Sequence, residues 1–220
     1  MFYNKWNGEI MKKIEQITNK ELEYVEKEIK KDIKYGREGI LIDSALKQFP
    51  LNNDISTVAM KVCLIDLTNG TNLSRNLGKS GGIYELAKKI TEINFDKRIS
   101  VGDITIVNEL AKWTKENIGK NLFSFITKYC LYHNVHCYNK DDFVIYDSVV
   151  AENLSRYISN EDYKTITGKN LHKNSLKKCK YNFNYEEYKN IIDFIIKKNN
   201  LKVDKPHRKI DWFIWYKNRG

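Results

Sequence analysis

The chain has 220 residues, of which 41% are hydrophobic and 30% are charged, and this is enough apolar material for one large or two small domains. No run approaches the roughly 18 apolar residues that a membrane-spanning helix needs, and residues 1–20 lack the apolar region of a signal peptide, so we expect a cytoplasmic protein with reduced thiols and no membrane partner. The formal net charge of +10 favours a polyanionic partner such as DNA, although a lysine-rich solvated surface gives the same balance.

Helical periodicity dominates the chain. Residues 11–35 are highly charged with a thin apolar stripe, which is typical of an exposed helix, and we place a break near Asn19. Period-two stretches are scarce, and Phe143 to Tyr146 is the best candidate for an extended segment. The sequence therefore predicts an all-α protein. The apolar sets that predict its helices are Ile55, Val58, Ala59 and Val62 after Asp54; Ile83, Leu86, Ala87 and Ile90 after Gly81; Ile106, Val107, Leu110 and Ala111 after Asp103; Leu122, Phe125, Ile126 and Tyr129; and Tyr188, Ile191, Ile192 and Ile195.

Two stretches near the C-terminus have unusual composition. Residues 158–182 are polar and basic, so they form either a loop at a domain edge or a surface that faces DNA. Residues 210–216 are strongly aromatic. We expect Trp212, Phe213 and Trp215 to anchor the last helix in the core, with base stacking as the alternative.

The cysteines and acidic residues do not indicate a metal centre. Cys63, Cys130, Cys137 and Cys179 are widely separated, and no close pair has the spacing of a zinc ribbon. His133 and His136 lie near two of these cysteines, but we expect no metal there. Asp141 and Asp142 are the nearest candidates for a metal-dependent nuclease, and we expect them in a loop.

The most informative pair is Lys128 and Asp147, which stand 19 residues apart. Residues 124–133 read as an amphipathic helix with Lys128 at the edge of its apolar stripe, and residues 143–150 as an apolar segment followed by an Asp that caps a new helix. A nucleophilic lysine needs a partly desolvated, neutral amine, and a nearby carboxylate stabilises positive charge or assists proton transfer. The simpler interpretation is a snorkelling lysine and a plain helix cap.

Residues 121–157 resemble the core of the helix-hairpin-helix DNA glycosylases, the superfamily that includes 8-oxoguanine glycosylase and endonuclease III. In this resemblance Lys128 matches the lysine that forms a Schiff base, and Asp147 matches the catalytic aspartate. The implied fold is a two-lobed helical bundle that forms one unit over residues 1–220, with lobes at about 36–158 and at 1–35 plus 159–220. The chain lacks the compact C-terminal four-cysteine cluster of some members, so no iron–sulfur cofactor is expected.

The implied activity is excision of a damaged or modified base from duplex DNA, followed by strand cleavage. A target nucleotide leaves the stack, Lys128 attacks its sugar, and Asp147 stabilises the cationic sugar or moves protons. The resemblance requires no metal or organic cofactor. It places contacts with DNA at Lys120, Ser124, Thr127 and Arg156.

The chain departs from the superfamily at the hairpin, which usually reads Leu-Pro-Gly-Val-Gly before the lysine. Here residues 122–127 contain neither glycine nor proline, and glycines at this place let backbone amides approach a phosphate. Gly119 offers a shifted turn. The alternative function is therefore a noncatalytic, basic helical protein that binds nucleic acid or a protein partner, for example in phage defence, on a glycosylase-like scaffold.

Overall fold

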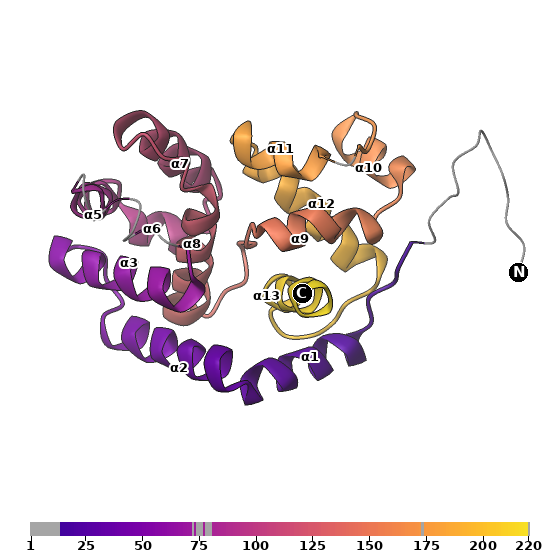
Figure 1. The fold of residues 1–220 in the computed structure, drawn as a ribbon, viewed down its shortest axis with the longest axis horizontal. Helices are drawn as coiled ribbons and strands as arrows, with labels where there is room; N and C mark the ends of the chain where they lie inside the picture. Colours follow the sequence, from indigo (N-terminus) through magenta and orange to yellow (C-terminus); the bar gives the residue numbers. More distant parts are fainter. Residues whose placement is uncertain (1–13, 72, 74–76, 78–80, 173, 220) are drawn as a thin grey trace, which may run out of the picture.

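The computed structural model describes residues 14–71, 73, 77, 81–172 and 174–219, and all of the elements in these ranges are helices (Figure 1). This part of the chain contains no strand, so the prediction of an all-α protein is confirmed. None of its helices has the length and apolar character needed to cross a membrane. The helices are α1 (Asn19–Lys31), α2 (Ile33–Gln48), α3 (Ile55–Asn69), α5 (Gly82–Glu92), α6 (Phe95–Ser100), α7 (Thr105–Asn117), α8 (Phe123–Tyr138), α9 (Ser148–Asn153), α10 (Asn160–Thr167), α11 (Ser175–Tyr181), α12 (Tyr185–Lys198) and α13 (Pro206–Asn218), with a 3₁₀ turn at Leu154–Arg156 after α9.

Side-chain caps define where several helices begin. The hydroxyl of Thr18 accepts a hydrogen bond from the amide of Glu21, and the carboxylate of Glu21 accepts one from the amide of Thr18, which is a capping box at the start of α1. The carboxylate of Asp54 accepts from the amide of Thr57 at 2.7 Å and caps α3. The break that the sequence places near Asn19 is thus the start of α1 rather than an interruption inside a longer helix.

The helices form two groups (Figure 1). The first contains α2, α3 and α5–α8, and the second contains α1 and α9–α13. The consecutive helices α1 and α2 pack against α13 and α8 respectively, and so they cover both groups along one side. Because α9 packs against α11 and α13, residues 148–153 lie with the C-terminal helices. The sequence instead placed the boundary between the two predicted lobes at about residue 158. The division into two lobes stays a prediction.

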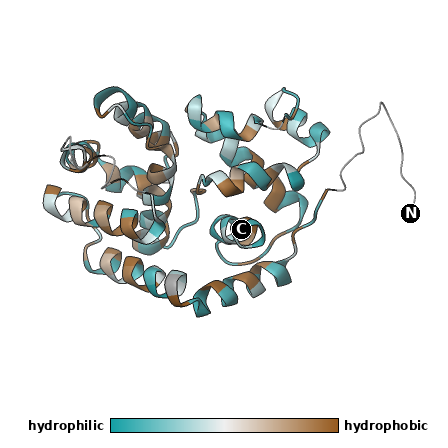
Figure 2. Cartoon of the chain, viewed as in Figure 1, coloured by the Kyte–Doolittle hydropathy of each residue, from teal (hydrophilic) through white to brown (hydrophobic). Residues whose placement is uncertain are grey.

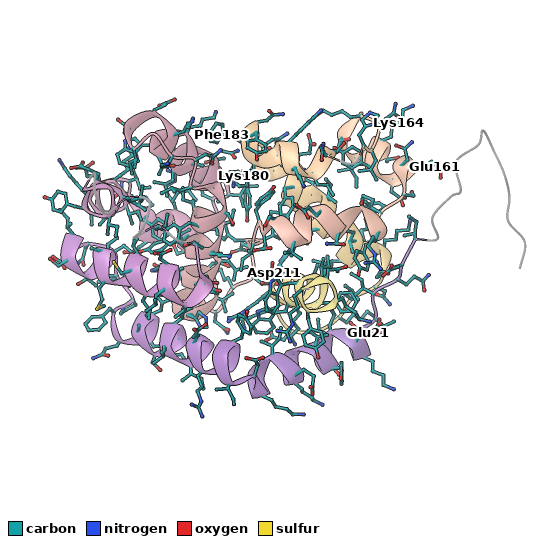
Figure 3. The ribbon with its side chains drawn as sticks, in the orientation of Figure 1. Glu21, Glu161, Lys164, Lys180, Phe183 and Asp211 are labelled. Atoms are coloured by element: carbon teal, nitrogen blue, oxygen red, sulfur yellow. The ribbon has the colours of Figure 1, made fainter. Side chains whose placement is uncertain are left out.

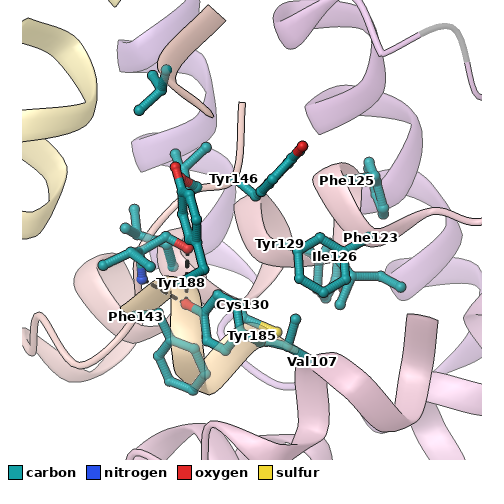
Figure 4. Close-up of a cluster of buried hydrophobic side chains, with 14 of the residues drawn as sticks. Val107, Phe123, Phe125, Ile126, Tyr129, Cys130, Phe143, Tyr146, Tyr185 and Tyr188 are labelled. Carbon is teal, nitrogen blue, oxygen red and sulfur yellow. Dashed lines mark hydrogen bonds between the residues drawn. The ribbon is translucent and has the colours of Figure 1, made fainter. Parts of the chain in front are cut away.

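Helix α8 is the central helix of the first group. Its residues from Phe125 to Val135 are all buried, and it packs against α2, α3, α6 and α7. A helix that is buried on every side belongs to the core, so the interpretation of residues 124–133 as an amphipathic helix is wrong. Figure 4 shows α8 side chains such as Phe123 and Tyr129 in the buried cluster that also contains Phe143 and Tyr185. Hydrophilic residues instead cover the outer turns of α7 and α11 (Figure 2).

Residues 158–182, expected as a loop or a basic surface, fold into α10 and α11. The hydroxyl of Ser159 accepts from the amide of Asp162 at 3.1 Å and caps α10. Tyr163 and Leu176 are buried inside the second group, while Lys164 and Lys178 are exposed. This stretch is therefore part of the folded unit, with a basic outer surface.

His207, near the start of α13, joins three parts of the second group. Its Nδ1 lies 3.0 Å from a carboxylate oxygen of Asp141, in the connection between α8 and α9, and its Nε2 lies 2.6 Å from a carboxylate oxygen of Asp193 on α12. Burial lowers the pKa of His207, but the hydrogen bonds to Asp141 and Asp193 outweigh it and raise the pKa to about 9. In the folded protein His207 is therefore protonated at neutral pH.

This bridge makes stability depend on pH. Because the folded pKa of about 9 exceeds the ordinary value of 6.5, the contribution of His207 is complete below pH 6.5 and is lost as the pH rises through 9. We predict that His207→Gln lowers the free energy of unfolding by up to about 3 kcal/mol near pH 6, and that the difference shrinks as the pH approaches about 9.5. Urea titrations across this range measure it. The exposed His172→Gln serves as the control, and a constant difference at all pH values would contradict the bridge.

Candidate functional site

Lys128 and Asp147, predicted from their spacing, lie together. The Nζ of Lys128, on α8, is 3.6 Å from Oδ2 of Asp147, and their side chains are 10% and 22% exposed. The other carboxylate oxygen of Asp147, Oδ1, accepts from the amide of Val149 at 2.8 Å and caps α9. One oxygen of Asp147 thus fixes the start of a helix, while the other faces a sheltered amine.

The pair opens onto a cavity of about 330 Å³ between the two groups of helices. Its aromatic wall comes from Tyr35 on α2, Tyr132 on α8, and Trp212 and Trp215 on α13. The volume is in the range of pockets that hold small organic ligands. Phe213 is buried, and Trp212 and Trp215 are half-buried and pack against the core, as expected for the last helix. Both tryptophans also line this cavity.

Within the described part of the chain, three buried polar atoms that have no hydrogen-bond partner belong to side chains that line this cavity. They are Oε2 of Glu38, Nε of Arg208 and Oδ1 of Asp211. Buried polar atoms in proteins are nearly always paired, because leaving one unpaired costs free energy. Their concentration at one cavity, from helices of both groups, therefore marks a place where a ligand can supply donors and acceptors.

Asp211 has a strongly altered acidity. Burial raises the pKa of its carboxyl to about 8, the nearby carboxylate of Asp147 adds to the rise, and the positive charges of Lys128 and Arg208 oppose it. At neutral pH most of the Asp211 side chains carry a proton and can donate a hydrogen bond. Figure 3 shows Asp211, a residue of α13, near the centre of the molecule. A carboxyl group shifted in this way is typical of functional sites.

Arg208 forms one wall of the cavity and links the two groups. Its guanidinium lies over the rings of Trp212 at 4.6 Å and Tyr132 at 5.5 Å, and its Nη1 is 3.0 Å from Nε2 of His136. Nδ1 of His136 is in turn 2.7 Å from a carboxylate oxygen of Asp43 on α2. Burial, and then the charge of Arg208, lower the pKa of His136 to about 4. A neutral imidazole therefore accepts from Arg208 and donates to Asp43.

Two of the residues expected to contact DNA are used inside the protein. Thr127 is fully buried, and its hydroxyl accepts from the amide of Tyr146 at 3.0 Å and donates to the carbonyl of Ser124 at 2.8 Å. The hydroxyl of Ser124 donates to the carbonyl of Tyr146 at 2.7 Å. Thr127 cannot reach a phosphate, so its assignment to DNA binding is wrong. Ser124 is half-buried, and its contact with DNA stays a prediction, although its hydroxyl already binds Tyr146.

The other two residues lie on the surface. Lys120 is exposed, and its contact with DNA stays a prediction. Arg156 is also exposed, but its guanidinium donates to Glu15 and, at 2.7 Å, to Asn218. A phosphate would have to displace these partners, so Arg156 serves first to hold residues 14–18 against the second group.

The hairpin between α7 and α8 differs from the one that the resemblance implies. Residues Phe123–Thr127 are the first turns of α8, and the turn itself is formed by residues 118–122, in which Gly119 has a φ of 75° that favours glycine. The amides of Lys120 and Leu122 donate to the carbonyl and hydroxyl of Thr114, each at 3.3 Å. These amides are therefore occupied and do not point at a phosphate.

The residues considered for metal binding have other partners. Asp141 bonds to His207, and Oδ2 of Asp142 accepts from the side-chain amide of Asn134 at 3.0 Å. His133 is buried with its ring 4.2 Å from that of Tyr129. Across the part of the chain that the structure describes, no group of three or more His, Cys, Asp and Glu side chains could hold a metal ion.

Comparison with known proteins identifies relatives but no activity. The sequence profile of the N-terminal domain of the HI_0787_N family matches residues 19–142, which include Lys128 and end before Asp147. A protein of Haemophilus influenzae that bears only the name "Uncharacterized protein" is 33% identical over 135 residues, or 60% of this chain. The chain spans 55% of the length of that relative. No solved structure matches the chain significantly.

The raised pKa of Asp211 predicts that this residue destabilises the fold at neutral pH. Its folded pKa of about 8 exceeds the ordinary value of 3.8, so its ionisation lowers the free energy of unfolding progressively as the pH rises from 3.8 to 8. We predict that Asp211→Asn is more stable than wild type at pH 8 by on the order of 2 kcal/mol, less than the full shift implies because the side chain faces a cavity. The two proteins should be equally stable near pH 4.

Denaturation at several pH values tests this, with Asp204→Asn as the control because Asp204 is exposed on the loop before α13. A variant of Asp211 that is less stable than wild type at every pH would show that the carboxyl group is held by favourable contacts instead.

Proposed function

The chain belongs to the HI_0787_N family, and we propose that it is a DNA glycosylase with AP lyase activity that excises a damaged or modified base through a Schiff base on Lys128. The observation that carries the proposal is the sheltered amine of Lys128, 3.6 Å from Asp147, at the wall of a cavity of about 330 Å³. The pair combines a candidate nucleophile with a carboxylate suited to stabilise a cationic sugar.

The cavity supports binding of a base that has left the DNA stack. Enzymes that act on bases move the target nucleotide into a pocket and hold it by stacking and by hydrogen bonds to its edge. Here Trp212, Trp215 and Tyr35 supply flat apolar surfaces, and the unpaired atoms of Arg208 and Asp211 supply polar contacts. A nucleobase has both the ring faces and the mixed donor and acceptor edge that such a lining requires.

The proposed reaction uses Lys128 and Asp147 in sequence. Once deprotonated, the amine of Lys128 forms a bond to the anomeric carbon as the bond from that carbon to the base breaks. The base leaves with the bonding electrons and takes up the proton that the nitrogen gives up. Asp147 stabilises the positive charge that develops on the sugar. The nitrogen then forms a double bond to the sugar carbon as the bond from that carbon to the ring oxygen breaks, and the ring oxygen takes up a proton from solvent, which gives a protonated Schiff base. Loss of a proton from the adjacent carbon to solvent is followed by cleavage of the C–O bond to the 3′ phosphate, which leaves with the bonding electrons. No step needs an oxidant or a reductant.

Exposed lysines on the second group support binding to the DNA backbone. Lys164 on α10 and Lys178 on α11 are exposed, and Figure 3 shows Lys164 at the outer edge of the molecule. Together with the net charge of +10, they favour contacts with phosphates.

A noncatalytic protein that binds nucleic acid, such as a phage-defence protein, is the second candidate. The observation that favours it is the turn between α7 and α8, where the amides of Lys120 and Leu122 are occupied by Thr114. Without those amides the turn lacks one means of fixing DNA over the cavity.

Borohydride trapping on DNA with an abasic site tests the proposed chemistry. We expect a covalent adduct with wild type and none with Lys128→Gln. Asp147→Asn should slow adduct formation by at least about 100-fold while it retains much of the stability, because asparagine also caps helices well. Lys197→Gln, which changes an exposed lysine on α12, is the control. If wild type gives no adduct on any abasic or damaged duplex, Lys128 is not a nucleophile and the noncatalytic candidate is favoured.

Salt dependence tests the predicted DNA partner. The apparent Kd for duplex DNA should rise steeply between about 50 and 200 mM salt, because each phosphate contact releases counterions. The double variant Lys164→Gln, Lys178→Gln should lower the slope of log K against log salt by about one for each phosphate that the variant no longer binds. Fluorescence anisotropy measures both. Failure to bind DNA at low salt would remove the basis for both functions.

A further inference from the structure

The connection between α8 and α9 approaches Asp147 as a buried, non-helical segment, residues 143–146. Such a segment cannot satisfy its own backbone groups as a helix does, so side chains must bind them. Tyr185 of α12 binds Val144 through both backbone groups, at 2.6 and 2.8 Å, and Tyr188 donates to the carbonyl of Ile145 at 3.2 Å. Figure 4 shows Tyr185 and Tyr188 beside this segment.

The last residue of the segment, Tyr146, is held differently, by two residues of α8. The hydroxyl of Thr127 accepts from its amide at 3.0 Å, and the hydroxyl of Ser124 donates to its carbonyl at 2.7 Å. The hydrogen bond from Tyr146 to Thr127 is buried, since these residues are 3% and 0% exposed, and the one from Ser124 is partly buried. This pair of contacts, which we name the hydroxyl clamp, fixes Tyr146 against one turn of α8.

The clamp joins the two residues that immediately precede the candidate catalytic pair. Thr127 precedes Lys128 on α8, and Tyr146 precedes Asp147. A hydrogen bond between Thr127 and Tyr146 therefore sets the distance between the backbones that carry the amine and the carboxylate. The tyrosines of α12 act on Val144 and Ile145, further from Asp147 and from a helix that does not carry Lys128.

We propose that Thr127 and Ser124 are positioning residues that hold Asp147 in register with Lys128. The expected effect on the rate of adduct formation rests on the proposed function. The placement of Asp147 relative to Lys128 is a property of the fold and does not depend on that function. The proposal also gives Thr127 a role in place of the contact with DNA that the sequence indicated.

Thr127→Val is the central test, because valine keeps the shape of threonine and removes the hydroxyl. Thr127→Ser keeps the hydroxyl and should restore function. Tyr188→Phe is the matched control, since it removes a buried hydroxyl that binds the same segment at Ile145. Ser124→Ala tests the other half of the clamp and replaces Thr127→Val if that variant does not fold.

The kinetic measurement is the single-turnover rate of borohydride trapping on abasic DNA, with the Kd measured in parallel. We expect Thr127→Val to lower the rate by on the order of 100-fold with little change in Kd, since a small misplacement of reacting groups costs this much. Thr127→Ser and Tyr188→Phe should trap at nearly the wild-type rate. Equal losses in Thr127→Val and Tyr188→Phe would overturn the proposal, because they would reflect a general structural role.

A second measurement does not depend on activity. NMR titration of the Lys128 amine, with and without Asp147→Asn, gives the electrostatic coupling between the two groups in each background. The proposal predicts that this coupling is weaker in Thr127→Val and unchanged in Thr127→Ser and Tyr188→Phe. Electrostatic coupling in Thr127→Val that equals the wild-type coupling would overturn the proposal. Wild type could form no adduct while the electrostatic coupling between Lys128 and Asp147 is weaker in Thr127→Val and unchanged in the other variants. In that case the proposed function fails and the positioning role stands.

Discussion

The constraint on which the structure depends is the burial of a non-helical stretch of backbone, residues 143–146, between two groups of helices. Backbone donors and acceptors away from water need partners, and a non-helical segment without a neighbouring strand must take them from side chains. Here hydroxyl groups from α8 and α12 perform that role. The need for these hydroxyls explains why tyrosine and threonine occupy positions in the core, where leucine would pack but could not form hydrogen bonds.

The same constraint brings charged groups together at the cavity. The chain leaves the buried segment at Asp147, which caps α9, and the packing of α13 against α9 and α12 brings Asp211 and Arg208 to the same cavity. Burial of Asp211 near Asp147 raises its pKa to about 8, which is unfavourable for the fold at neutral pH. A group that opposes stability without an evident packing benefit is characteristic of sites under selection for binding or chemistry.

Much of the fold follows from sequence, but the site only partly does. Periodicity locates helices such as α3 and α12, and the spacing of Lys128 and Asp147 brings the two together because a helix and a short return connect them. The full burial of α8 could not be predicted, because its polar residues are covered by partners distant in sequence. Asp211 and Arg208 were missed for a similar reason. The one signal for Asp211 was a carboxylate within an aromatic run.

A comparison within the molecule shows how the geometry of Lys128 and Asp147 differs from that of another sheltered ion pair. Lys209 and Glu26 are sheltered to the same degree, with side chains 11% and 20% exposed, and their charged atoms lie 2.8 Å apart. Lys128 and Asp147, at 10% and 22%, are 3.6 Å apart, and the closest hydrogen bond of Asp147 goes to the amide of Val149. A sheltered ion pair stabilises a fold only when its geometry compensates for desolvation. The looser pair is poorly suited to that purpose, whereas it leaves the amine free to approach a ligand in the cavity.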